Sequence, residues 1–223
     1  MINNRLVPLV TFAGFEKLTQ ARVAVIGLGG VGGIACEALA RSGVGHILLC
    51  DFDQVEASNI NRQVVATTQT IGKSKVEVMA SIICAINPVC EIICYPRPYQ
   101  NFLEEYKIQY VIDAIDDVPA KIRLITDCLA LSLPFISSMG AGNKMNPELI
   151  RVINIHKTTH YPLARIIRSN FRDQSFEVVA SSEEVKRLSG EPIIGSYMPV
   201  VATFGLLASD YIIKEILRRP LCS

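Results

Sequence analysis

The chain has 223 residues, a formal net charge of +1 and an apolar content of 50%. This length fits one α/β domain, and the near-neutral charge excludes a strongly basic nucleic-acid-binding protein by composition alone. The apolar content favours a buried sheet covered by helices, and we find neither a signal peptide nor an apolar stretch long enough to span a membrane.

The predicted elements alternate between strands and helices. In chain order, we expect an arm with a short helix (1–20), a strand (22–26), a helix (31–42), a strand (46–50), a polar loop (52–69), a helix (73–86), a strand (91–95), a helix (100–106), a strand (109–114), a helix (118–131), two strands (134–137 and 149–155), a basic helix (162–172), an irregular segment (176–197) and a core helix (199–213). This order predicts an α/β fold with a Rossmann-like, doubly wound, mainly parallel sheet and helices on both faces. We expect one domain over residues 1–223, in which residues 143–197 form an insert on the substrate side.

Seven cysteines, at positions 36, 50, 84, 90, 94, 128 and 222, lie mostly in apolar stretches. No pair has the two-residue spacing of a zinc knuckle, so we expect buried thiols and no zinc. A chain with many cysteines and no disulfide framework indicates a reducing compartment, and we therefore expect a cytoplasmic protein.

A glycine-rich turn follows the first predicted strand and opens a helix. Its glycines are Gly27, Gly29, Gly30 and Gly32. Glycines at this position let backbone N–H groups approach phosphate, and the helix N-terminus adds a favourable dipole. Asp51 ends the next strand, where a carboxylate can accept hydrogen bonds from ribose hydroxyls. The pattern predicts an adenine-nucleotide site, but it also fits an NAD dehydrogenase, and tight strand–helix packing without a ligand is the alternative.

Cationic residues after the second strand favour a triphosphate over NAD. Arg62 has a planar guanidinium that grips phosphate oxygens, and Lys75 lies in the first turn of a predicted helix. Asp116 follows the fourth strand, where ligands bind in such sheets, so it is placed to hold Mg²⁺ against a triphosphate. The charged residues of this region also have interpretations that need no ligand. These are that Arg62 pairs with a surface acid, that Lys73 is solvated and that Asp117 caps the next helix.

Five separated motifs appear in order: the glycine turn, residues 51–53, residues 58–63, Lys75 and residues 113–117. In this combination the chain resembles the ThiF/MoeB/HesA superfamily, the bacterial relatives of ubiquitin-activating enzymes, over roughly residues 14–142. The resemblance implies a homodimer that binds Mg-ATP and adenylates a carboxylate, with Arg62, Lys75 and Asp116 as catalytic residues and Asp116 as the magnesium ligand. The ATP contacts that it implies are Gly27, Gly29, Gly30, Gly32, Asp51, Asp53, Asn59, Arg62, Gln63 and Lys75. In MoeB-like members an arginine near the N-terminus reaches the ATP of the other subunit, and Arg5 lies near that position.

Within this superfamily the chain is similar to members that modify tRNA. The similar stretches are residues 38–45, 111–117, 140–142, 157–158, 162–164 and 201–205. This resemblance implies a tRNA substrate that carries threonylcarbamoyladenosine in its anticodon loop. ATP would convert the threonine carboxylate to an acyl-adenylate with release of pyrophosphate, and an amide nitrogen of the same modification would then close a ring and expel AMP.

Three other functions stay open. One is adenylation of the C-terminus of a ubiquitin-like or sulfur-carrier protein, with a carrier or sulfur-transfer protein as partner, although the absence of zinc-binding cysteine pairs counts against it. Another is an NAD-dependent oxidoreductase, in which Arg62, Lys75 and Asp116 would have no role. The last is a nucleotide-sensing module without catalysis.

Between Glu148 and Asp173 the sequence has no acidic residue. The cationic residues in this stretch are Arg151, Lys157, Arg165, Arg168 and Arg172. On one helix, Arg165, Arg168 and Arg172 would share a face, and with Lys157 they form a candidate contact surface for tRNA phosphates. A solvated helix face is the alternative. We expect Tyr161 and Phe171 in the core rather than stacked on bases.

Overall fold

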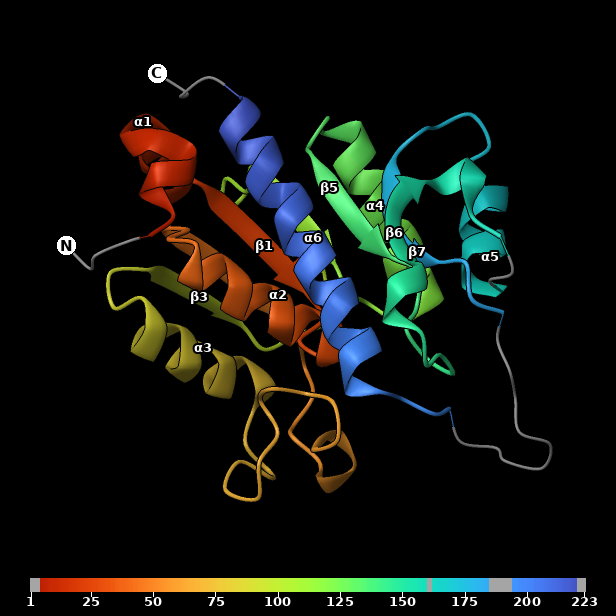
Figure 1. The fold of residues 1–223 in the computed structure, drawn as a ribbon, viewed down its shortest axis with the longest axis horizontal. Coiled ribbons are helices and arrows are strands. Elements are labelled where there is room, and N and C mark those ends of the chain that lie inside the picture. The colour runs from red at the N-terminus through yellow and green to blue at the C-terminus, as the bar shows by residue number, and fades with distance from the viewer. Residues whose placement is uncertain (1–4, 160–161, 185–193, 220–223) are drawn as a thin grey trace.

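The computed structural model describes residues 5–159, 162–184 and 194–219, and one sheet forms its centre (Figure 1). The strands are β1 (Arg22–Ile26), β2 (His46–Cys50), β3 (Glu91–Tyr95), β4 (Tyr110–Asp113), β5 (Phe135–Ser138), β6 (Ile150–Asn154) and β7 (Glu177–Ser181). Their order is β3-β2-β1-β4-β5-β7-β6, and every neighbouring pair is parallel except β6 and β7. The predicted Rossmann-like, mainly parallel sheet is therefore confirmed, and its strand order reverses between β1 and β4.

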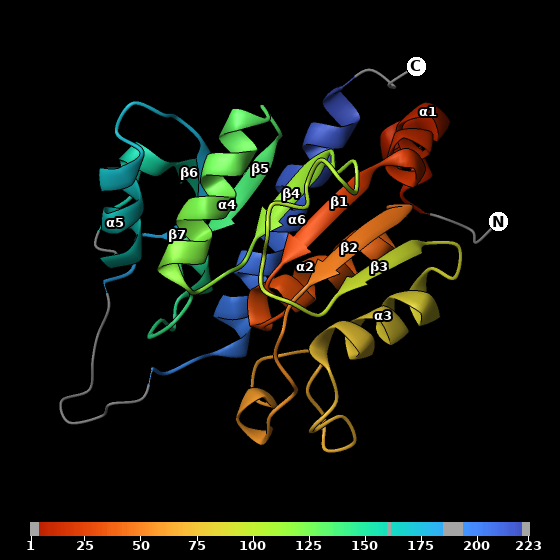
Figure 2. The same cartoon turned by 180° about the vertical axis from the view of Figure 1, so that it is seen from behind.

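Helices cover both faces of the sheet (Figure 2). They are α1 (Val7–Gln20), α2 (Gly30–Arg41), α3 (Lys75–Ile86), α4 (Val118–Ala130), α5 (Pro162–Asn170) and α6 (Met198–Arg218), with short 3₁₀ helices at Ala57–Asn59, Pro147–Leu149 and Ile155–Lys157. Alternate residues of β1 face opposite sides, as a strand requires. Val23 and Val25 join the core that includes α1, α2, α3 and α6, whereas Ala24 and Ile26 join the core that includes α4 and α5.

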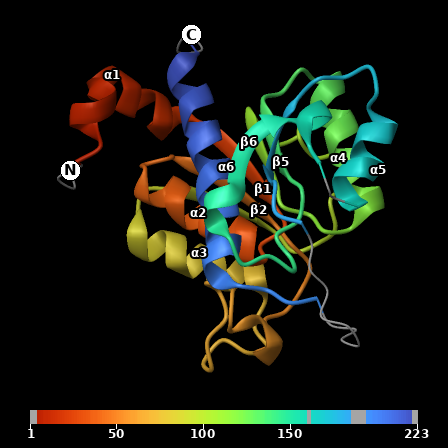
Figure 3. The same ribbon diagram turned by 45° about the vertical axis from the view of Figure 1, so that its right-hand side comes forward.

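Helix α6 is the longest helix in the described part of the chain, and it packs beside α2 and the end of α1 (Figure 3). Lys17 on α1 donates from Nζ to the backbone oxygen of Leu217 at 2.8 Å, which joins the two ends of the chain. Within the described ranges, no helix is both long and apolar enough to cross a membrane.

The helix expected over residues 100–106 is wrong, because this segment forms turns. Asn101 and Lys107 take positive φ angles of 49° and 51°, which an α-helix does not accommodate. The turns bury Phe102, whose ring lies 4.6 Å from that of Tyr95 and 5.1 Å from that of Tyr99. Aromatic packing against the sheet therefore overrides the local helix preference.

The irregular segment expected over residues 176–197 is also partly wrong, because it contains β7. This strand lies between β5 and β6, and Val178, Val179 and Ala180 are all buried. Its apolar run is only the three residues 178–180, between Glu177 and Ser181, which is shorter than the run expected of a buried strand and explains the error. Residues 185–193 of this segment, like residues 1–4 of the predicted arm, lie outside the described residues.

Candidate active site

The glycine-rich turn joins β1 to α2 at the carboxyl edge of the sheet, next to the reversal of strand order. A Cβ added to Gly32 would lie 1.8 Å from the backbone oxygen of Gly27, so a larger residue there would force the turn open. A Cβ on Gly30 would lie 2.3 Å from Cγ1 of Val201 on α6 and 2.9 Å from the backbone oxygen of Arg62. The turn is thus held between α6 and the segment that carries Arg62.

Asp51 links the glycine turn to the loop after β2. Its Oδ2 accepts a hydrogen bond from the backbone N–H of Leu28 at 2.6 Å, and its Oδ1 accepts one from that of Asp53 at 2.8 Å. Burial raises the pKa of the Asp51 carboxyl, although these two N–H groups and Lys75 oppose the rise. Each oxygen keeps a further lone pair, so the group can also accept hydrogen bonds from two neighbouring hydroxyls.

Lys75 is buried at the start of α3 and pairs with Asp53. Its Nζ lies 2.7 Å from Oδ2 of Asp53, and the lysine side chain is 7% exposed against 51% for the aspartate. The backbone N–H of Lys75 also donates to the backbone oxygen of Asp53 at 3.1 Å. The two predicted ATP contacts therefore form one unit, in which the aspartate is the solvent-facing partner of a buried cation.

The segment with Asn59, Arg62 and Gln63 lies against the glycine turn. Asn59 is buried, and its Oδ1 accepts from the backbone N–H of Glu56 at 3.1 Å, which closes the short 3₁₀ helix. The Arg62 guanidinium donates from Nη1 to the backbone oxygen of Ser58 at 2.8 Å. These bonds give Asn59 and Arg62 structural roles within their own loop.

Gln63 differs from its neighbours because part of its amide is unsatisfied. The residue is 7% exposed, and its Oε1 is the one buried side-chain oxygen or nitrogen in the described residues without a hydrogen-bond partner. Its Nε2 lies 3.8 Å from the position that a Cβ on Gly29 would take. Buried polar atoms are nearly always paired, so an unpaired one beside the glycine turn indicates a group that a ligand or water satisfies.

At the end of β4, Asp113 forms a fully buried cluster that sequence reasoning missed. Its Oδ2 lies 2.7 Å from Nζ of Lys121 and accepts a hydrogen bond from Ser137 at 2.5 Å. A sequence signal for it exists: the buried face of α4 consists of Lys121, Leu124, Ile125 and Cys128, so a lysine occupies an otherwise apolar helical stripe.

Asp116 and Asp117, just after this cluster, have different positions. Asp117 accepts from the backbone N–H of Ala120 at 2.8 Å and caps α4, which confirms the interpretation of that residue that needs no ligand. Asp116 is exposed at the carboxyl edge of the sheet.

Asp116 could contribute a single carboxylate to a magnesium site beside the glycine-rich turn. Among the described residues, no three His, Cys, Asp or Glu side chains gather into a metal-binding group, and the nearby Asp113 is committed to Lys121. Mg²⁺ is commonly held by one or two carboxylates together with substrate phosphates and water. Asp116 therefore fits a metal shared between the protein and the nucleotide rather than an all-protein cage.

The basic residues after β6 do not form the single helical face that we expected. Lys157, Arg165 and Arg172 are exposed, but α5 ends at Asn170, so Arg172 lies beyond the helix. Arg168 is partly buried, and its guanidinium donates to both the backbone oxygen and the hydroxyl of Thr158. Arg168 therefore stabilises the local fold, and Lys157, Arg165 and Arg172 remain as exposed cations.

Of the remaining predicted residues, the structure describes Phe171 and Arg5 but not Tyr161. Phe171 is 5% exposed and packs with Phe176, so its expected place in the core is confirmed. Tyr161 lies outside the described residues, and Arg5 is exposed just before α1.

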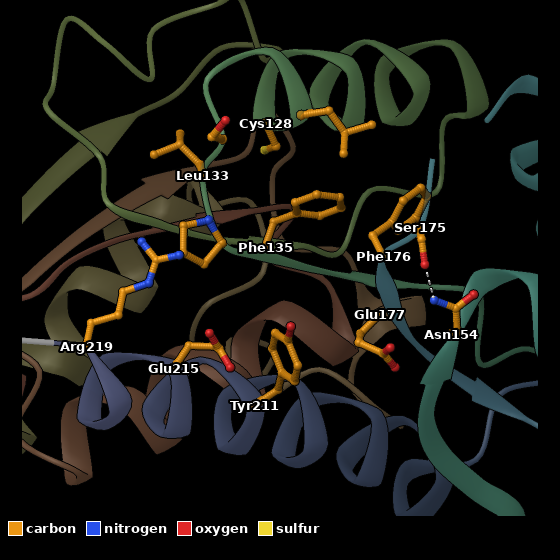
Figure 4. Close-up of a pocket in the computed structure, with 13 residues that line it drawn as sticks. Cys128, Leu133, Phe135, Asn154, Ser175, Phe176, Glu177, Tyr211, Glu215 and Arg219 are labelled. Atoms are coloured by element: carbon orange, nitrogen blue, oxygen red, sulfur yellow. Dashed lines mark hydrogen bonds between the residues drawn. The ribbon is translucent and has the colours of Figure 1, made fainter. Parts of the chain in front are cut away.

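A separate groove of about 430 Å³ lies at the opposite edge of the sheet (Figure 4). It is lined by the first residues of β5 and β7 together with the ends of α4 and α6. Figure 4 shows Tyr211 and Glu215 extending from α6 towards Phe135, and burial followed by Glu215 and Glu177 raises the pKa of the Tyr211 hydroxyl. Parallel strands place their starts and ends at opposite edges, so this groove is distinct from the glycine-turn site.

The model of the ThiF family matches residues 2–222. The chain belongs to the ThiF family. A ThiF-family relative, the tRNA threonylcarbamoyladenosine dehydratase of Bacillus subtilis (strain 168), is 37% identical over 232 residues, which covers 92% of this chain and 90% of that protein. The crystal structure of the Escherichia coli tRNA N6-threonylcarbamoyladenosine dehydratase TcdA in complex with ATP has a TM-score of 0.88 and 33% identity, and the match covers 95% of this chain and 91% of the TcdA chain.

Another relative matches over less of both proteins. The molybdopterin-synthase adenylyltransferase of Escherichia coli (strain K12) is 34% identical over 145 residues, which is 62% of this chain and 56% of that protein. The resemblance inferred from the motifs is therefore confirmed, and its tRNA-modifying branch is the better supported one.

Proposed function

We propose that this protein uses ATP to adenylate the threonine carboxylate of threonylcarbamoyladenosine in tRNA, and that ring closure within the modification then releases AMP. The observation that carries this proposal is the extent of the match to the dehydratases. It covers 92% of this chain and 90% of the Bacillus subtilis protein, and 95% of this chain and 91% of the TcdA chain, so it spans nearly the full length of both partners and includes the region of β6, α5 and β7.

The nucleotide would lie over the glycine turn. Asp51 would accept hydrogen bonds from the ribose hydroxyls with the lone pairs that Leu28 and Asp53 leave free. Arg62 and Lys75 would face the phosphates, with Lys75 held by Asp53 until a phosphate competes for its ammonium. Asn59 keeps Arg62 in place through its loop, and Gln63 would contact the nucleotide through its unsatisfied amide.

The reaction has two steps. A carboxylate oxygen of the substrate attacks the α-phosphorus, the bond to the bridging oxygen breaks, and pyrophosphate leaves; Arg62 and Lys75 stabilise the charge that develops on it. The amide nitrogen of the same modification then attacks the activated carbonyl, loses its proton, and expels AMP. Mg²⁺ held by Asp116 would neutralise phosphate charge when it is bound.

The acceptor is tested by mixing the protein with ATP and labelled pyrophosphate, and adding tRNA or a sulfur-carrier protein in turn. We expect exchange of label into ATP with tRNA that carries the modification, and mass spectrometry should then find the dehydrated nucleoside. Exchange with the carrier alone would favour the molybdopterin-type activity. Thermal protection by NAD but not by ATP would favour an oxidoreductase, and ATP protection without exchange would favour a nucleotide sensor.

The phosphate-binding residues are tested by substituting Arg62, Lys75 and Asp116 with alanine one at a time. Each variant should lower the turnover of dehydration by at least about a hundredfold, because each removes a group that stabilises developing charge. Substituting exposed Lys73, which lies just before α3, should leave turnover unchanged. Near-normal turnover in all three variants would contradict the assignment.

We also propose, from the family resemblance, that the protein is a cytoplasmic homodimer. Leu9 and Phe12 on α1 are 82% and 76% exposed, and a second copy of the chain would cover such apolar side chains. Sedimentation velocity should give the mass of a dimer, and a monomer at micromolar concentration would reject this part of the proposal.

A further inference from the structure

Lys121 and Asp113 form an ion pair at the core of the molecule. Both side chains are 0% exposed, and the pair is completed by Ser137, whose Oγ lies 3.3 Å from the lysine Nζ and donates to the aspartate. The three residues come from α4, β4 and β5, and Asp113 lies opposite Ser137 in the parallel pair of strands. The cluster therefore joins three elements at the carboxyl edge of the sheet.

The cluster is tied directly to the turn that carries Asp116. Asp113 Oδ1 accepts a hydrogen bond from the backbone N–H of Ile115 at 3.1 Å, so one carboxylate holds Lys121 with one oxygen and the turn with the other. The backbone N–H of Ala114 donates to Ile26 at 2.8 Å, and its backbone oxygen would lie 2.7 Å from a Cβ on Gly27. The turn after β4 is thus packed against the first glycine of the glycine-rich turn.

Stability alone does not account for a buried ion pair at this position. Removing two charges from water costs several kcal/mol per ion, and replacing such pairs by well-packed apolar residues is often neutral or stabilising. The neighbours of Lys121 on the same face of α4 are Leu124 and Ile125, so an apolar residue would suit the environment. The buried Lys121–Asp113 pair is therefore better explained by the position in which it holds the turn after β4.

We propose that Lys121 is a positioning residue, which fixes Asp113 and through it the turn that presents Asp116 to the metal and the triphosphate. Because Asp113 is paired with Lys121 and Asp117 caps α4, Asp116 is the carboxylate of this turn that is free to bind a metal. The inference rests on the proposed function, because it assigns Lys121 to the metal side of the same site.

The test is a titration of Mn²⁺, as a spectroscopic substitute for Mg²⁺, into the protein saturated with a non-hydrolysable ATP analogue, at a temperature where every variant is folded. Lys121→Met should weaken metal binding at least about tenfold, as the loss of a group that orients a metal ligand does. Its affinity for the analogue without metal should stay within about twofold, since the glycine turn and Asp51 are untouched. Arg123→Met, a matched change on the exposed face of α4, should alter neither quantity.

A structural role would give a different result. If Lys121→Met lowers the melting temperature but leaves the metal affinity of the folded protein unchanged, the proposal is wrong. If that variant does not fold, Lys121→Gln keeps a donor of similar length but removes the charge that fixes Asp113, and it should also weaken metal binding; no change would reject the proposal.

Asp116→Asn in the same titration separates this proposal from the proposed function. Loss of metal binding there supports the assigned metal ligand, whatever Lys121→Met does. Unchanged metal binding in Asp116→Asn would show that the metal ligand itself is wrongly assigned.

Discussion

At the scale of single residues, the candidate site holds polar groups whose burial costs the folded protein free energy. Asp51 is 8% exposed and Gln63 is 7% exposed, yet neither has its full hydrogen-bonding capacity used by the protein. Groups of this kind lower stability without a ligand and raise affinity with one. Substituting Gln63 should therefore change stability and nucleotide binding in opposite directions. Substituting Asp51 should change how stability depends on pH.

Gln63→Met keeps the length of the side chain and removes the unsatisfied oxygen. We expect the free energy of unfolding without ligand to rise by about 1 kcal/mol, because an unpaired buried acceptor is lost. ATP binding should weaken by roughly five- to tenfold, the value of one hydrogen bond. Urea unfolding and calorimetric titration measure the two effects. Gln69→Met, at an exposed position of the same loop, should change neither, and unaltered ATP affinity in Gln63→Met would exclude a nucleotide contact.

Asp51→Asn tests the charge of the buried carboxyl through pH. Because burial raises the pKa of Asp51 in the folded state, its contribution to stability is fully present below the ordinary value of 3.8 and is lost as the pH rises through the folded-state pKa. The asparagine variant lacks this loss. The difference in unfolding free energy, variant minus parent, should therefore grow between acid and neutral pH in urea titrations, while ATP binding weakens at neutral pH. A difference that stays constant with pH would mean that Asp51 titrates normally.

At the scale of elements, the segment around α5 separates cations that face solvent from one that holds the fold. Arg165 and Arg172 are exposed, whereas Arg168 binds Thr158 at the end of the preceding 3₁₀ helix. Arg168 is partly buried and donates to both oxygens of Thr158, so it is a poorer candidate for an RNA phosphate contact than the exposed Arg165 and Arg172. The candidate tRNA contact surface therefore consists of the exposed cations Lys157, Arg165 and Arg172.

Arg165→Gln combined with Arg172→Gln should weaken tRNA binding and reduce the slope of log affinity against log salt by roughly one to two, because two phosphate contacts are lost. The melting temperature and ATP affinity should stay unchanged. Arg168→Gln should instead lower the melting temperature. Filter binding at several salt concentrations gives the slope, and an unchanged slope in the double variant would exclude this surface as the RNA contact.

Elements that carry a long apolar run or a recognisable local motif are predictable from the sequence, and those shaped by the tertiary fold are not. The glycine turn and the strands before and after it follow from local chemistry, so the sequence alone predicts that Asp51, Arg62 and Lys75 lie near one edge of the sheet. Strand β7 is not recognised in this way, because its apolar run is only three residues long and polar residues flank it. Lys121 was missed for a related reason: a lysine is ordinarily assigned to the surface, and its partner Asp113 lies on a different element.

At the scale of the whole molecule, the residues that we propose for ATP and the exposed cations for tRNA lie in different parts of the chain. Every predicted ATP contact lies between Gly27 and Lys75, on or after β1 and β2, and Asp116 follows β4. The exposed cations Lys157, Arg165 and Arg172 all come later, around α5 and before β7. The reversal of strand order between β1 and β4 brings the first group to one crevice, as expected for open α/β sheets.

Helix α6 affects how the protein is made. Val201 lies against Gly30, and the amide of Asn61 donates to the backbone oxygen of Ser196, so α6 and its approach pack against the glycine-rich turn and the loop that carries Arg62. During translation the N-terminal strands leave the ribosome first, but a nascent chain that has not yet exposed residues 196–201 lacks these contacts. The glycine-rich turn thus acquires its support from α6 only in the closing stage of synthesis.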